Sequence, residues 1–448
     1  MKQSALQEEI IDRKQLVKYF STGAVSRAQL RTGIECEVFA VREEDLKPVP
    51  FFGEKGIEAI LKRMASNFGW SPVFEGPHVI GLHKGSCSVT LEPGGQIELS
   101  CPPDTGIAKC IEEHTEFTRQ LREITSPMGI RLMKIAYHPT ARLDDVEWVP
   151  KSRYREMSKY FREKGGHLAH HMMKLTTSVQ TSIDYENEAD FSNKIMLASY
   201  LTPILQGVYS NSPFKQGRFS GSMDFRGVCW EYTDDDRCGL MYRAFSGNFG
   251  FDDYIDFLLD MPMIVRFDRE GAVPMKGMPF KEYCKSGPLT MEEWHSHVSF
   301  AFPEIRLRRY IELRMCDSVP DSLVPTIPAL LKGLFYDSEN RKELAEMFKD
   351  VSPEEALKAY REVHQKALRA EYSGRPILQL ARDIVSLAEQ GLTRLGREGA
   401  ISSPDEAGLL DPLKEQLWEK GMSPAEELVK LWEKNGYKIW SLRDRILL

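Results

Sequence analysis

Several short segments of this chain alternate apolar residues with charged ones, and this pattern restricts the fold more than any other feature. In Ile-Glu-Cys-Glu-Val, Glu35 and Glu37 point to the same side of a strand because side chains alternate with a period of two. In Ile-Glu-Leu-Arg-Met, Glu312 and Arg314 likewise share one side, opposite apolar residues. Such segments predict sheets with one apolar face and one charged face.

Two further segments show the same alternation, and the polar residues that they align are Gln180, Ser182, Asp184, Glu92 and Glu98. The segment with the two glutamates contains Pro-Gly-Gly and is expected to form a hairpin. A connection made by residues 93–97 would set Glu92 directly across from Glu98. Together the four segments offer five glutamates and an arginine on candidate polar faces.

Two interpretations of these polar faces remain open. A half-exposed antiparallel sheet can simply turn its polar face to water. Alternatively, the carboxylates gather in one place, and they would then need cations because like charges that face each other destabilise a sheet. Rigidly held oxygen ligands suit Mg²⁺, which usually shares its coordination sphere with water and substrate phosphates. The second interpretation implies nucleotide-dependent phosphoryl chemistry.

The common phosphate-binding motifs are absent from the sequence. It contains neither G-x-x-x-x-G-K-[ST] nor a G-x-G-x-x-G between a strand and a helix. If ATP binds, we therefore expect it to bind through metal-coordinating carboxylates and basic side chains.

The remaining hydrophobic patterns predict an α+β fold with an antiparallel or mixed sheet. Helices are expected at 6–20, 55–68, 106–128 and 187–208. Strands are expected within 79–100 and at 33–41, 131–137, 175–186 and 305–316. Beyond about residue 323 the pattern is almost wholly helical. We therefore expect a catalytic body at 1–320 and a mostly helical portion at 321–448, packed on the same unit.

Composition excludes several classes of protein. The formal net charge of −7 argues against a general nucleic-acid binder, which would carry a basic stripe. No stretch approaches the roughly 18 apolar residues that a membrane span needs. The first residues carry acids where a signal peptide needs a positive and then an apolar region, so we expect a cytoplasmic protein. The 8 cysteines form no Cys-x-x-Cys pair and are expected to be reduced thiols.

Two groups of histidines allow a metal-binding and a structural interpretation. The groups are His167, His170 and His171, and His295 and His297. Imidazole suits transition metals, but no cysteine lies near the first group, which we place between a loop and a helix. We expect a structural or surface role for both groups.

Seven motifs occur in order along the chain, at 31–39, 91–100, 150–154, 211–214, 233–237, 302–314 and 422–426. The most specific is Leu-Glu-Pro-Gly-Gly-Gln at 91–96. In this order they resemble the plant-type glutamate–cysteine ligases, which also occur in many bacteria. The resemblance implies a fold similar to the glutamine synthetase catalytic domain, in which a curved antiparallel sheet forms a funnel with helices outside.

The resemblance also implies the reaction and its participants. ATP phosphorylates the γ-carboxylate of L-glutamate, and the amine of L-cysteine attacks the acyl phosphate, which gives γ-glutamylcysteine, ADP and phosphate. This is the first step of glutathione biosynthesis. Mg²⁺ is the expected metal, with Mn²⁺ able to substitute, and the protein is expected to be a monomer or homodimer with no nucleic-acid or membrane partner.

By resemblance, the metal-ligand positions are Glu35, Glu37, Glu92, Glu98 and Glu312. Arg314 corresponds to the arginine that faces the transferring phosphate, and Arg226 to one that binds a substrate carboxylate. Arg237 is a weaker candidate for the same pocket. Gln180 and Ser182 complete the predicted substrate site. Arginine suits these roles because its planar fork binds carboxylate and phosphate through two hydrogen bonds.

The chain departs from the family pattern at three places. Ser182 stands where Asn or His is expected near a metal, so water is expected to complete that coordination sphere. Cys110 matches one half of a regulatory disulfide of the plant enzymes, but Pro325 stands where its partner cysteine should be. The hairpin around Cys284 is also short. We therefore expect no redox switching through those bridges.

Two other functions remain open. A related carboxylate–amine ligase would join glutamate to another amine or serve another thiol pathway such as that of ergothioneine, and nothing in the sequence identifies a cysteine-selective contact. A non-catalytic protein could instead use its helical C-terminal portion to bind a partner, although the intact set of five glutamates and Arg314 argues against this.

Overall fold

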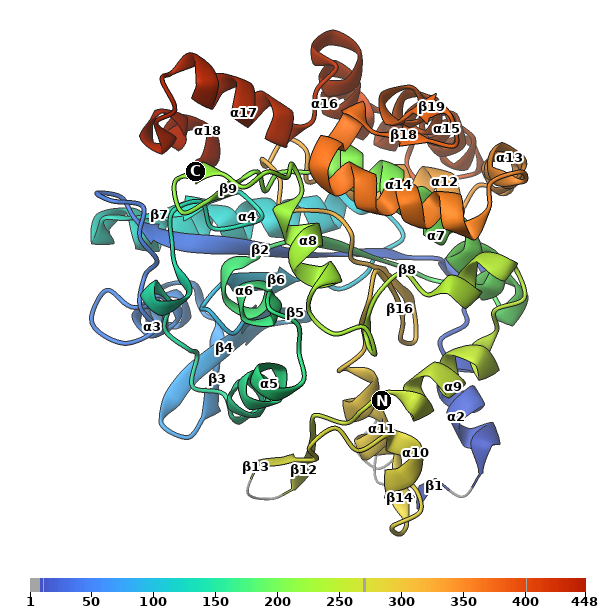
Figure 1. Ribbon diagram of the computed structural model, residues 1–448, viewed down its shortest axis with the longest axis horizontal. Helices are drawn as coiled ribbons and strands as arrows, with labels where there is room; N and C mark the ends of the chain where they lie inside the picture. Colours follow the sequence, from blue (N-terminus) through green and yellow to red (C-terminus); the bar gives the residue numbers. More distant parts are fainter. Residues whose placement is uncertain (1–8, 11, 269–270, 400) are drawn as a thin grey trace.

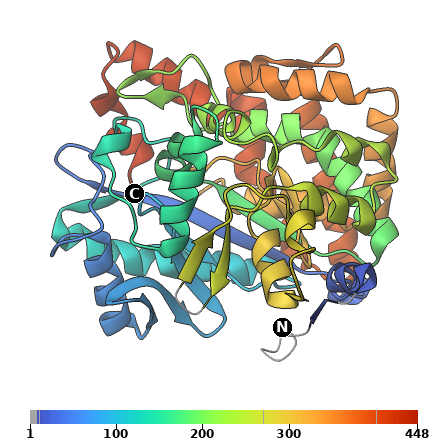
Figure 2. The ribbon, with the colours of Figure 1, turned by 60° about the horizontal axis from the view of Figure 1, so that its bottom comes forward.

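The computed structural model describes residues 9, 10, 12–268, 271–399 and 401–448. These residues form a mixed fold of helices and strands around a large sheet (Figure 1). Figure 2 shows the long strand β2 (Thr32–Arg42), in blue, running through the middle of the molecule with helices on both sides of it. This agrees with the predicted α+β class.

Within the described residues, the central sheet has nine strands and every pairing in it is antiparallel. In spatial order its strands are β16 (Ile305–Leu307), β17 (Ile311–Leu313), β8 (Val179–Ile183), β2, β6 (Ile97–Ser100), β5 (Cys87–Leu91), β4 (His78–Lys84) and β3 (Ser71–Glu75), and β7 (Ile130–Met133) pairs with β2. The prediction of an antiparallel or mixed sheet is thus resolved in favour of the antiparallel one.

The two faces of this sheet differ, as the alternation predicts. On the rear face, which carries Ile34, Cys36 and Val38, the side chains of β2 are buried against α4 (Ile107–Thr125). The cavity face carries Glu35 and Glu37 instead. The rear face belongs to the main hydrophobic core, so burial of its apolar side chains fixes which way the glutamates point.

The helices that cover the sheet and close the chain each bury apolar side chains. In chain order they are α2 (Arg13–Ser21), α3 (Ile57–Phe68), α4, α5 (Ser152–Glu163), α6 (Ala169–Leu175), α7 (Glu188–Tyr209), α8 (Phe225–Glu231), α9 (Phe251–Asp260), α10 (Phe280–Tyr283), α11 (Met291–Val298), α12 (Thr326–Phe335), α13 (Ser338–Phe348), α14 (Pro353–Lys366), α15 (Ile377–Glu398), α16 (Asp411–Lys414), α17 (Pro424–Lys434) and α18 (Arg443–Ile446). Short strands outside the sheet are β1 (Glu9–Ile10), β9 (Phe214–Lys215), β10 (Arg218–Phe219), β11 (Cys238–Gly239), β12 (Val265–Asp268), β13 (Gly271–Pro274), β14 (Leu289–Thr290), β15 (Phe302–Pro303), β18 (Glu371–Tyr372) and β19 (Arg375–Pro376).

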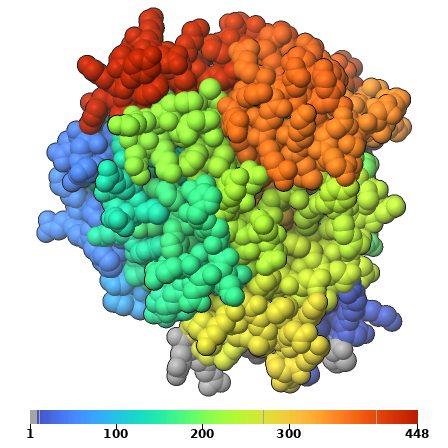
Figure 3. Space-filling view, in the orientation of Figure 1, coloured from blue at the N-terminus to red at the C-terminus, as the bar shows by residue number. Residues whose placement is uncertain are grey.

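The helical character of the chain beyond residue 323 is confirmed, apart from the short β18–β19 hairpin. Buried residues of this portion, such as Leu330 and Ile384, belong to the same core cluster as Ile34. Figure 3 shows these helices, in orange and red, along one edge of the molecule and in contact with the rest. A division of the chain at residue 320 stays a prediction. No described helix has the length and apolar character needed to cross a membrane.

Three details differ from the sequence prediction. The predicted strand 305–316 is a hairpin of β16 and β17, in which Arg306 pairs with Glu312. In the β5–β6 hairpin, Thr90 and not Glu92 lies opposite Glu98. The reason is that the turn closes one residue earlier than expected, with Leu91 paired to Ile97.

The third difference concerns the first helix, which was expected from residue 6. It begins at Arg13, because Asp12 and Gln15 form a reciprocal capping box there. Glu9 and Ile10 instead pair with β14 as strand β1. Positions 6–8 and 11 lie outside the described residues.

Candidate active site

A cavity of about 420 Å³ lies on the side of the sheet that carries Glu35 and Glu37. The acidic side chains among its described lining residues are Glu35, Glu37, Glu92 and Glu98. The basic ones are Lys151, Arg153, Arg226, Arg306, Arg308 and Arg314. Aromatic and sulfur-containing side chains complete the wall, among them Tyr154, Trp230, Phe302, Met157, Met172 and Met173.

The four lining glutamates, called the carboxylate cluster from here on, come from the centre of the sheet. Glu37 on β2 lies directly opposite Glu98 on β6, so two like charges share one cross-strand pair. Glu35 lies two residues before Glu37 on the same face of β2, and Glu92 comes directly after β5. The sequence prediction that these carboxylates gather in one place is therefore correct, although Glu92 and Glu98 are not cross-strand partners.

Burial and mutual repulsion raise the pKa values of this cluster. Burial, with the neighbouring Glu98 and Glu312, raises the pKa of Glu35 to about 8. Burial, with Glu92 and Glu98, raises the pKa of Glu37 to about 8 as well. The pKa of Glu98 rises to about 7 for the same reasons.

These observations test whether the cluster fits a divalent cation. Several hard oxygen donors lie together at buried or half-buried positions, where burial and then the neighbouring glutamates raise their pKa values. A bound cation would offset the repulsion among the carboxylates, because each of them is attracted to the ion. The donor set therefore fits Mg²⁺ or Mn²⁺.

Glu312 differs from the cluster. It is 1% exposed and is not part of the described cavity lining. Arg306 donates to both of its carboxylate oxygens, at 2.6 and 2.9 Å, and Arg314 donates to one of them at 3.0 Å. Burial alone would raise its pKa, but the two arginines lower it to about 2. A role for Glu312 as a metal ligand stays a prediction.

Arg314 lies in the cavity wall and is held by groups on three sides. Its Nη1 donates to Gln180 Oε1 at 2.6 Å, and its guanidinium lies 5.4 Å from the ring centre of Trp230. Gln180 also donates from Nε2 to Glu37 at 3.1 Å. The predicted residues Arg314, Gln180 and Glu37 thus form one connected group, with the amide of Gln180 between the cation and a carboxylate.

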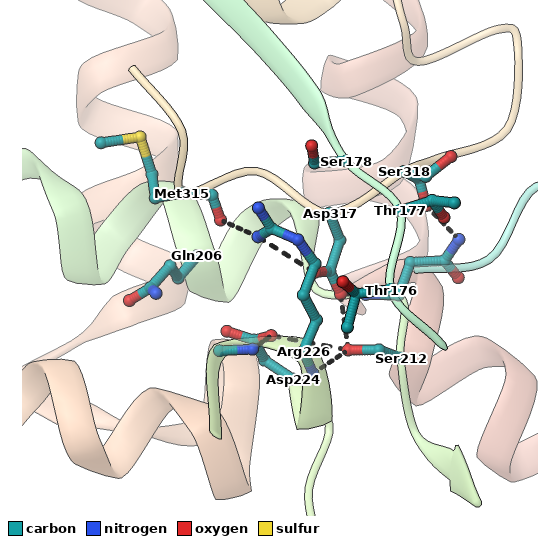
Figure 4. Close-up of polar contacts among 12 residues, drawn as sticks. Thr176, Thr177, Ser178, Gln206, Ser212, Asp224, Arg226, Met315, Asp317 and Ser318 are labelled. Carbon is teal, nitrogen blue, oxygen red and sulfur yellow. Dashed lines mark hydrogen bonds and ion pairs between the residues drawn. The ribbon is translucent and has the colours of Figure 1, made fainter. Parts of the chain in front are cut away.

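Arg226 lines the cavity but also supports the strand end beside it (Figure 4). Its Nη2 donates to the backbone carbonyl of Arg314 at 2.8 Å, and its Nη1 lies 3.7 Å from Asp317 Oδ1. Asp317 in turn accepts hydrogen bonds from the backbone of Asn211 and the hydroxyl of Ser212, both at 2.7 Å. Arg226 is therefore fixed in place before any substrate binds.

Two of the predicted substrate residues do not line the cavity. Arg237 is fully buried, where it donates to Asp234 at 2.6 Å and to the hydroxyl of Tyr160 at 2.9 Å. These partners pair its charge inside the core, and a role for Arg237 in substrate binding stays a prediction. Ser182 lies on β8 opposite Glu312, outside the described lining.

Sequence reasoning missed several residues of the site. Ser178 donates to both oxygens of Glu37, from its backbone and its hydroxyl, each at 2.9 Å. The basic residues that it missed are Lys151, Arg153, Arg306 and Arg308. Two signals were available, because Lys151 and Arg153 lie in the motif at 150–154, and Arg306 and Arg308 alternate with period two.

The histidines have structural partners, as expected. His171 is hydrogen-bonded to Tyr137 at 2.6 Å and His170 to the carbonyl of Ser158 at 2.9 Å. His295 is bonded to the Tyr19 hydroxyl, and His297 to the Leu258 carbonyl. Among the described residues, neither histidine group forms a set of ligand atoms close enough to hold a metal.

Comparisons with known proteins find similarity over nearly the whole chain. Residues 31–440 match the family model of glutamate-cysteine ligase family 2. The chain is 32% identical over 431 residues to a chloroplastic glutamate–cysteine ligase of Arabidopsis thaliana. The aligned residues make up 95% of this chain and 80% of the relative. The identity to glutamate–cysteine ligase A of Oryza sativa subsp. indica is also 32%, over 432 residues and 85% of that relative.

A solved structure supports the fold. The glutamate–cysteine ligase of Francisella tularensis, determined in complex with AMP, aligns with a TM-score of 0.56 and 12% identity. The alignment covers 92% of this chain and 87% of that one.

Proposed function

The chain belongs to glutamate-cysteine ligase family 2 and is a ligase, and from this premise we propose that it joins the γ-carboxylate of L-glutamate to the amine of L-cysteine with ATP as co-substrate. The observation that carries the proposal is the cavity in which the carboxylate cluster faces several basic side chains. Metal-coordinating carboxylates and phosphate-binding cations are the two parts that phosphoryl transfer requires.

The reaction proceeds in two steps. A γ-carboxylate oxygen of glutamate attacks the γ-phosphorus of ATP, and ADP leaves, which produces γ-glutamyl phosphate. The amine of cysteine then attacks the activated carbonyl carbon, phosphate leaves, and the amine loses a proton. The product, γ-glutamylcysteine, is the precursor of glutathione.

Glu35, Glu37, Glu92 and Glu98 would hold the Mg²⁺ ions, with Glu312 as a further candidate ligand. When bound, these ions supply charge neutralisation for the phosphate groups of ATP. The chain's own contribution is to fix the carboxylates in advance, since Ser178 and Gln180 hold the oxygens of Glu37 by hydrogen bonds.

Arg314 stabilises the negative charge on the phosphoryl group as it moves. Its guanidinium is fixed by Gln180 and Glu312, so little reorganisation is needed when charge develops. Arg226, Lys151 and Arg153 give the cavity further positive charge for the anionic substrates. Burial lowers the pKa of Arg153 to about 10, which leaves this side chain charged at neutral pH.

Several finer points belong to the same proposal. We infer that the antiparallel sheet curves into a funnel around the substrates, as in glutamine-synthetase-like ligases. A division into a catalytic body at 1–320 and a helical portion at 321–448, a monomeric or homodimeric state, and a cytoplasmic location are retained as predictions.

The decisive experiment measures phosphate release by the purified protein at saturating Mg²⁺ with ATP, L-glutamate and a panel of amines. We expect release to require both glutamate and an amine, with cysteine best and 2-aminobutyrate usable, because the latter replaces the thiol by a methyl group. A difference of one such group is worth about 10–200-fold in selectivity.

Two results would contradict the proposal. If another amine exceeds cysteine by a wide margin, the chain is a related glutamate–amine ligase. If no amine stimulates phosphate release, the interpretation as a non-catalytic partner-binding protein gains support.

A further inference from the structure

Three potential metal ligands meet on the rear face of the sheet, away from the carboxylate cluster. The Sγ atoms of Cys87 and Cys101 and a carboxylate oxygen of Glu113 all lie within 4.8 Å of one another. Two of the three ligands come from the β5–β6 hairpin and its continuation, and the third comes from α4.

The strand register explains why the two thiols meet. Ser88 on β5 pairs with Ser100 on β6, so Cys87 and Cys101 occupy the next position of the same ladder. They share a face with Val89 and Leu99, whereas Thr90 and Glu98 point to the cavity face. One hairpin therefore carries a catalytic carboxylate on one side and a pair of thiols on the other.

Glu113 gives an independent indication of a missing partner. Among the described residues its buried Oε2 has no hydrogen-bond partner, while its side chain is hydrogen-bonded to the thiol of Cys87. A buried acceptor without a partner is unusual because it loses its hydration without compensation. The nearby thiol of Cys110 differs, since its Sγ lies 3.6 Å from the backbone carbonyls of both Thr32 and Pro102 and can donate to either.

We propose that Cys87, Cys101 and Glu113 form a Zn²⁺ site that is separate from the catalytic metal site. Zn²⁺ accepts two thiolates and one carboxylate in a tetrahedral arrangement, and water can take the fourth position. Cys87 and Glu113 are only half-buried, which leaves the ion a path from solvent. Thiolates favour this ion over Mg²⁺, so the two sites of the chain select different metals.

Zn²⁺ binding at this site would stabilise the fold. The ion would tie α4 to the hairpin that carries Glu98, and it would add its binding free energy to the stability of the folded chain. Because Zn²⁺ binds thiolates and not thiols, binding releases protons and strengthens as the pH rises.

The test uses the full chain, fully reduced and held at saturating Mg²⁺ so that the carboxylate cluster is occupied. Titration with Cd²⁺, a spectroscopic substitute for Zn²⁺, should produce a sulfur-to-metal charge-transfer band in the ultraviolet that saturates at one ion per chain. With Zn²⁺, X-ray absorption should show two sulfur ligands at about 2.3 Å.

Variants locate the site. Cys87→Ser and Cys101→Ser should abolish the charge-transfer band, and Glu113→Gln should weaken Zn²⁺ binding at least about tenfold. Cys284→Ser is the matched control, because Cys284 is also a half-buried free thiol, and it should bind as the wild type does. Circular dichroism establishes that each variant is folded.

Absence of the band in the wild-type chain would overturn the proposal without reference to any variant. So would an undiminished band in folded Cys87→Ser, or a loss of the band in Cys284→Ser equal to that in Cys87→Ser. None of these measurements uses ligase activity, so their outcome is independent of the proposed function.

Discussion

Two buried groups of charged side chains lie next to each other in this molecule, and they are built on opposite principles. The carboxylate cluster collects like charges, whereas the neighbouring group, called the Arg226 network from here on, mixes charges of both signs. The network consists of Ser212, Asp224, Arg226, Asp317 and His364. Figure 4 shows its centre, where Arg226 lies near Asp317 and Ser212.

The Arg226 network pairs charges of opposite sign, although burial and the neighbouring Asp224 still raise the pKa of Asp317 well above its usual value. Asp317 has an ion pair and two hydrogen bonds, and Asp224 caps α8 by accepting from the backbone of Gly227 at 2.7 Å. His364 on α14 lies 3.7 Å from Asp224. Burial would lower the pKa of this histidine, but Glu231 and Asp224 raise it overall.

The difference shows how a cluster of like charges and a network of paired opposite charges should respond differently to substitution. A network with balanced charges stabilises the fold only while every partner is present, because removal of one leaves another charge buried and unpaired. A cluster of like charges instead costs free energy in the folded protein until a ligand neutralises it. Each prediction below contrasts these two behaviours.

The largest effect is expected from Glu35→Gln and Glu92→Gln, whose activity should fall below detection at any Mg²⁺ concentration. The metal-free variants should be no less stable than the wild type, because each loses one repelling charge. Phosphate release and thermal unfolding in a chelator measure the two parts. Glu112→Gln, at an exposed position of α4, is the matched control. A folded variant with near-normal turnover would remove that glutamate from the metal site.

The next largest effect is expected from Asp317→Ala, which leaves Arg226 without its ion-pair partner. Loss of one member of a buried ion pair costs about 3–5 kcal/mol of the free energy of unfolding. Denaturant unfolding of the metal-free protein measures it, with Asp317→Asn as the milder variant because an amide oxygen can still accept from Asn211 and Ser212. An effect as small as that of Glu35→Gln would erase the contrast between the two groups.

A third prediction concerns Arg314, which borders both groups. Arg314→Ala should lower kcat by about 10²–10³-fold, or about 2.7–4 kcal/mol, because a preorganised donor acts mainly on the transition state. Arg314→Lys should not recover fully, since an ammonium lacks the planar fork. Steady-state kinetics at saturating substrate measures this. A large rise in the KM for ATP at unchanged kcat would make Arg314 a residue that binds the ground state.

Local pattern was enough to predict the carboxylate cluster but not the Arg226 network. The period of two placed Glu35 and Glu37 on one face, because alternation within a strand is a local property. It could not give the partner of Glu98, because register depends on where the turn closes. The alternation also did not reveal that Arg306 donates to Glu312 across the β16–β17 hairpin.

The Arg226 network could not be predicted from the sequence for a different reason. Asp224 and His364 are 140 positions apart in the chain and meet only when α14 packs beside α8. Arg237 shows the same limit, since this arginine of a family motif is buried and paired with Asp234, which its motif does not indicate. An arginine's role is decided by its tertiary partners, which the sequence does not display.

The last prediction concerns the pH dependence of stability. In the metal-free protein, the pKa values of Glu35 and Glu37 are about 8, above the 4.5 of the unfolded chain. Below about pH 4.5 both states are protonated, so the full contribution of these groups to stability is present. As the pH rises toward 8, the unfolded chain releases these protons more readily, so the free energy of unfolding falls.

Chemical denaturation of the metal-free protein from pH 5 to pH 8 tests this directly. The part of the decline that comes from the carboxylate cluster should be smaller in Glu35→Gln and should disappear at saturating Mg²⁺, because the ion stabilises the ionised carboxylates. His364 also contributes a decline, since its pKa is raised in the folded state and its stabilisation is lost above that value. That contribution should persist in Glu35→Gln and vanish in His364→Gln. Equal slopes in the wild type and Glu35→Gln would mean that the carboxylate cluster is as well balanced as the network beside it.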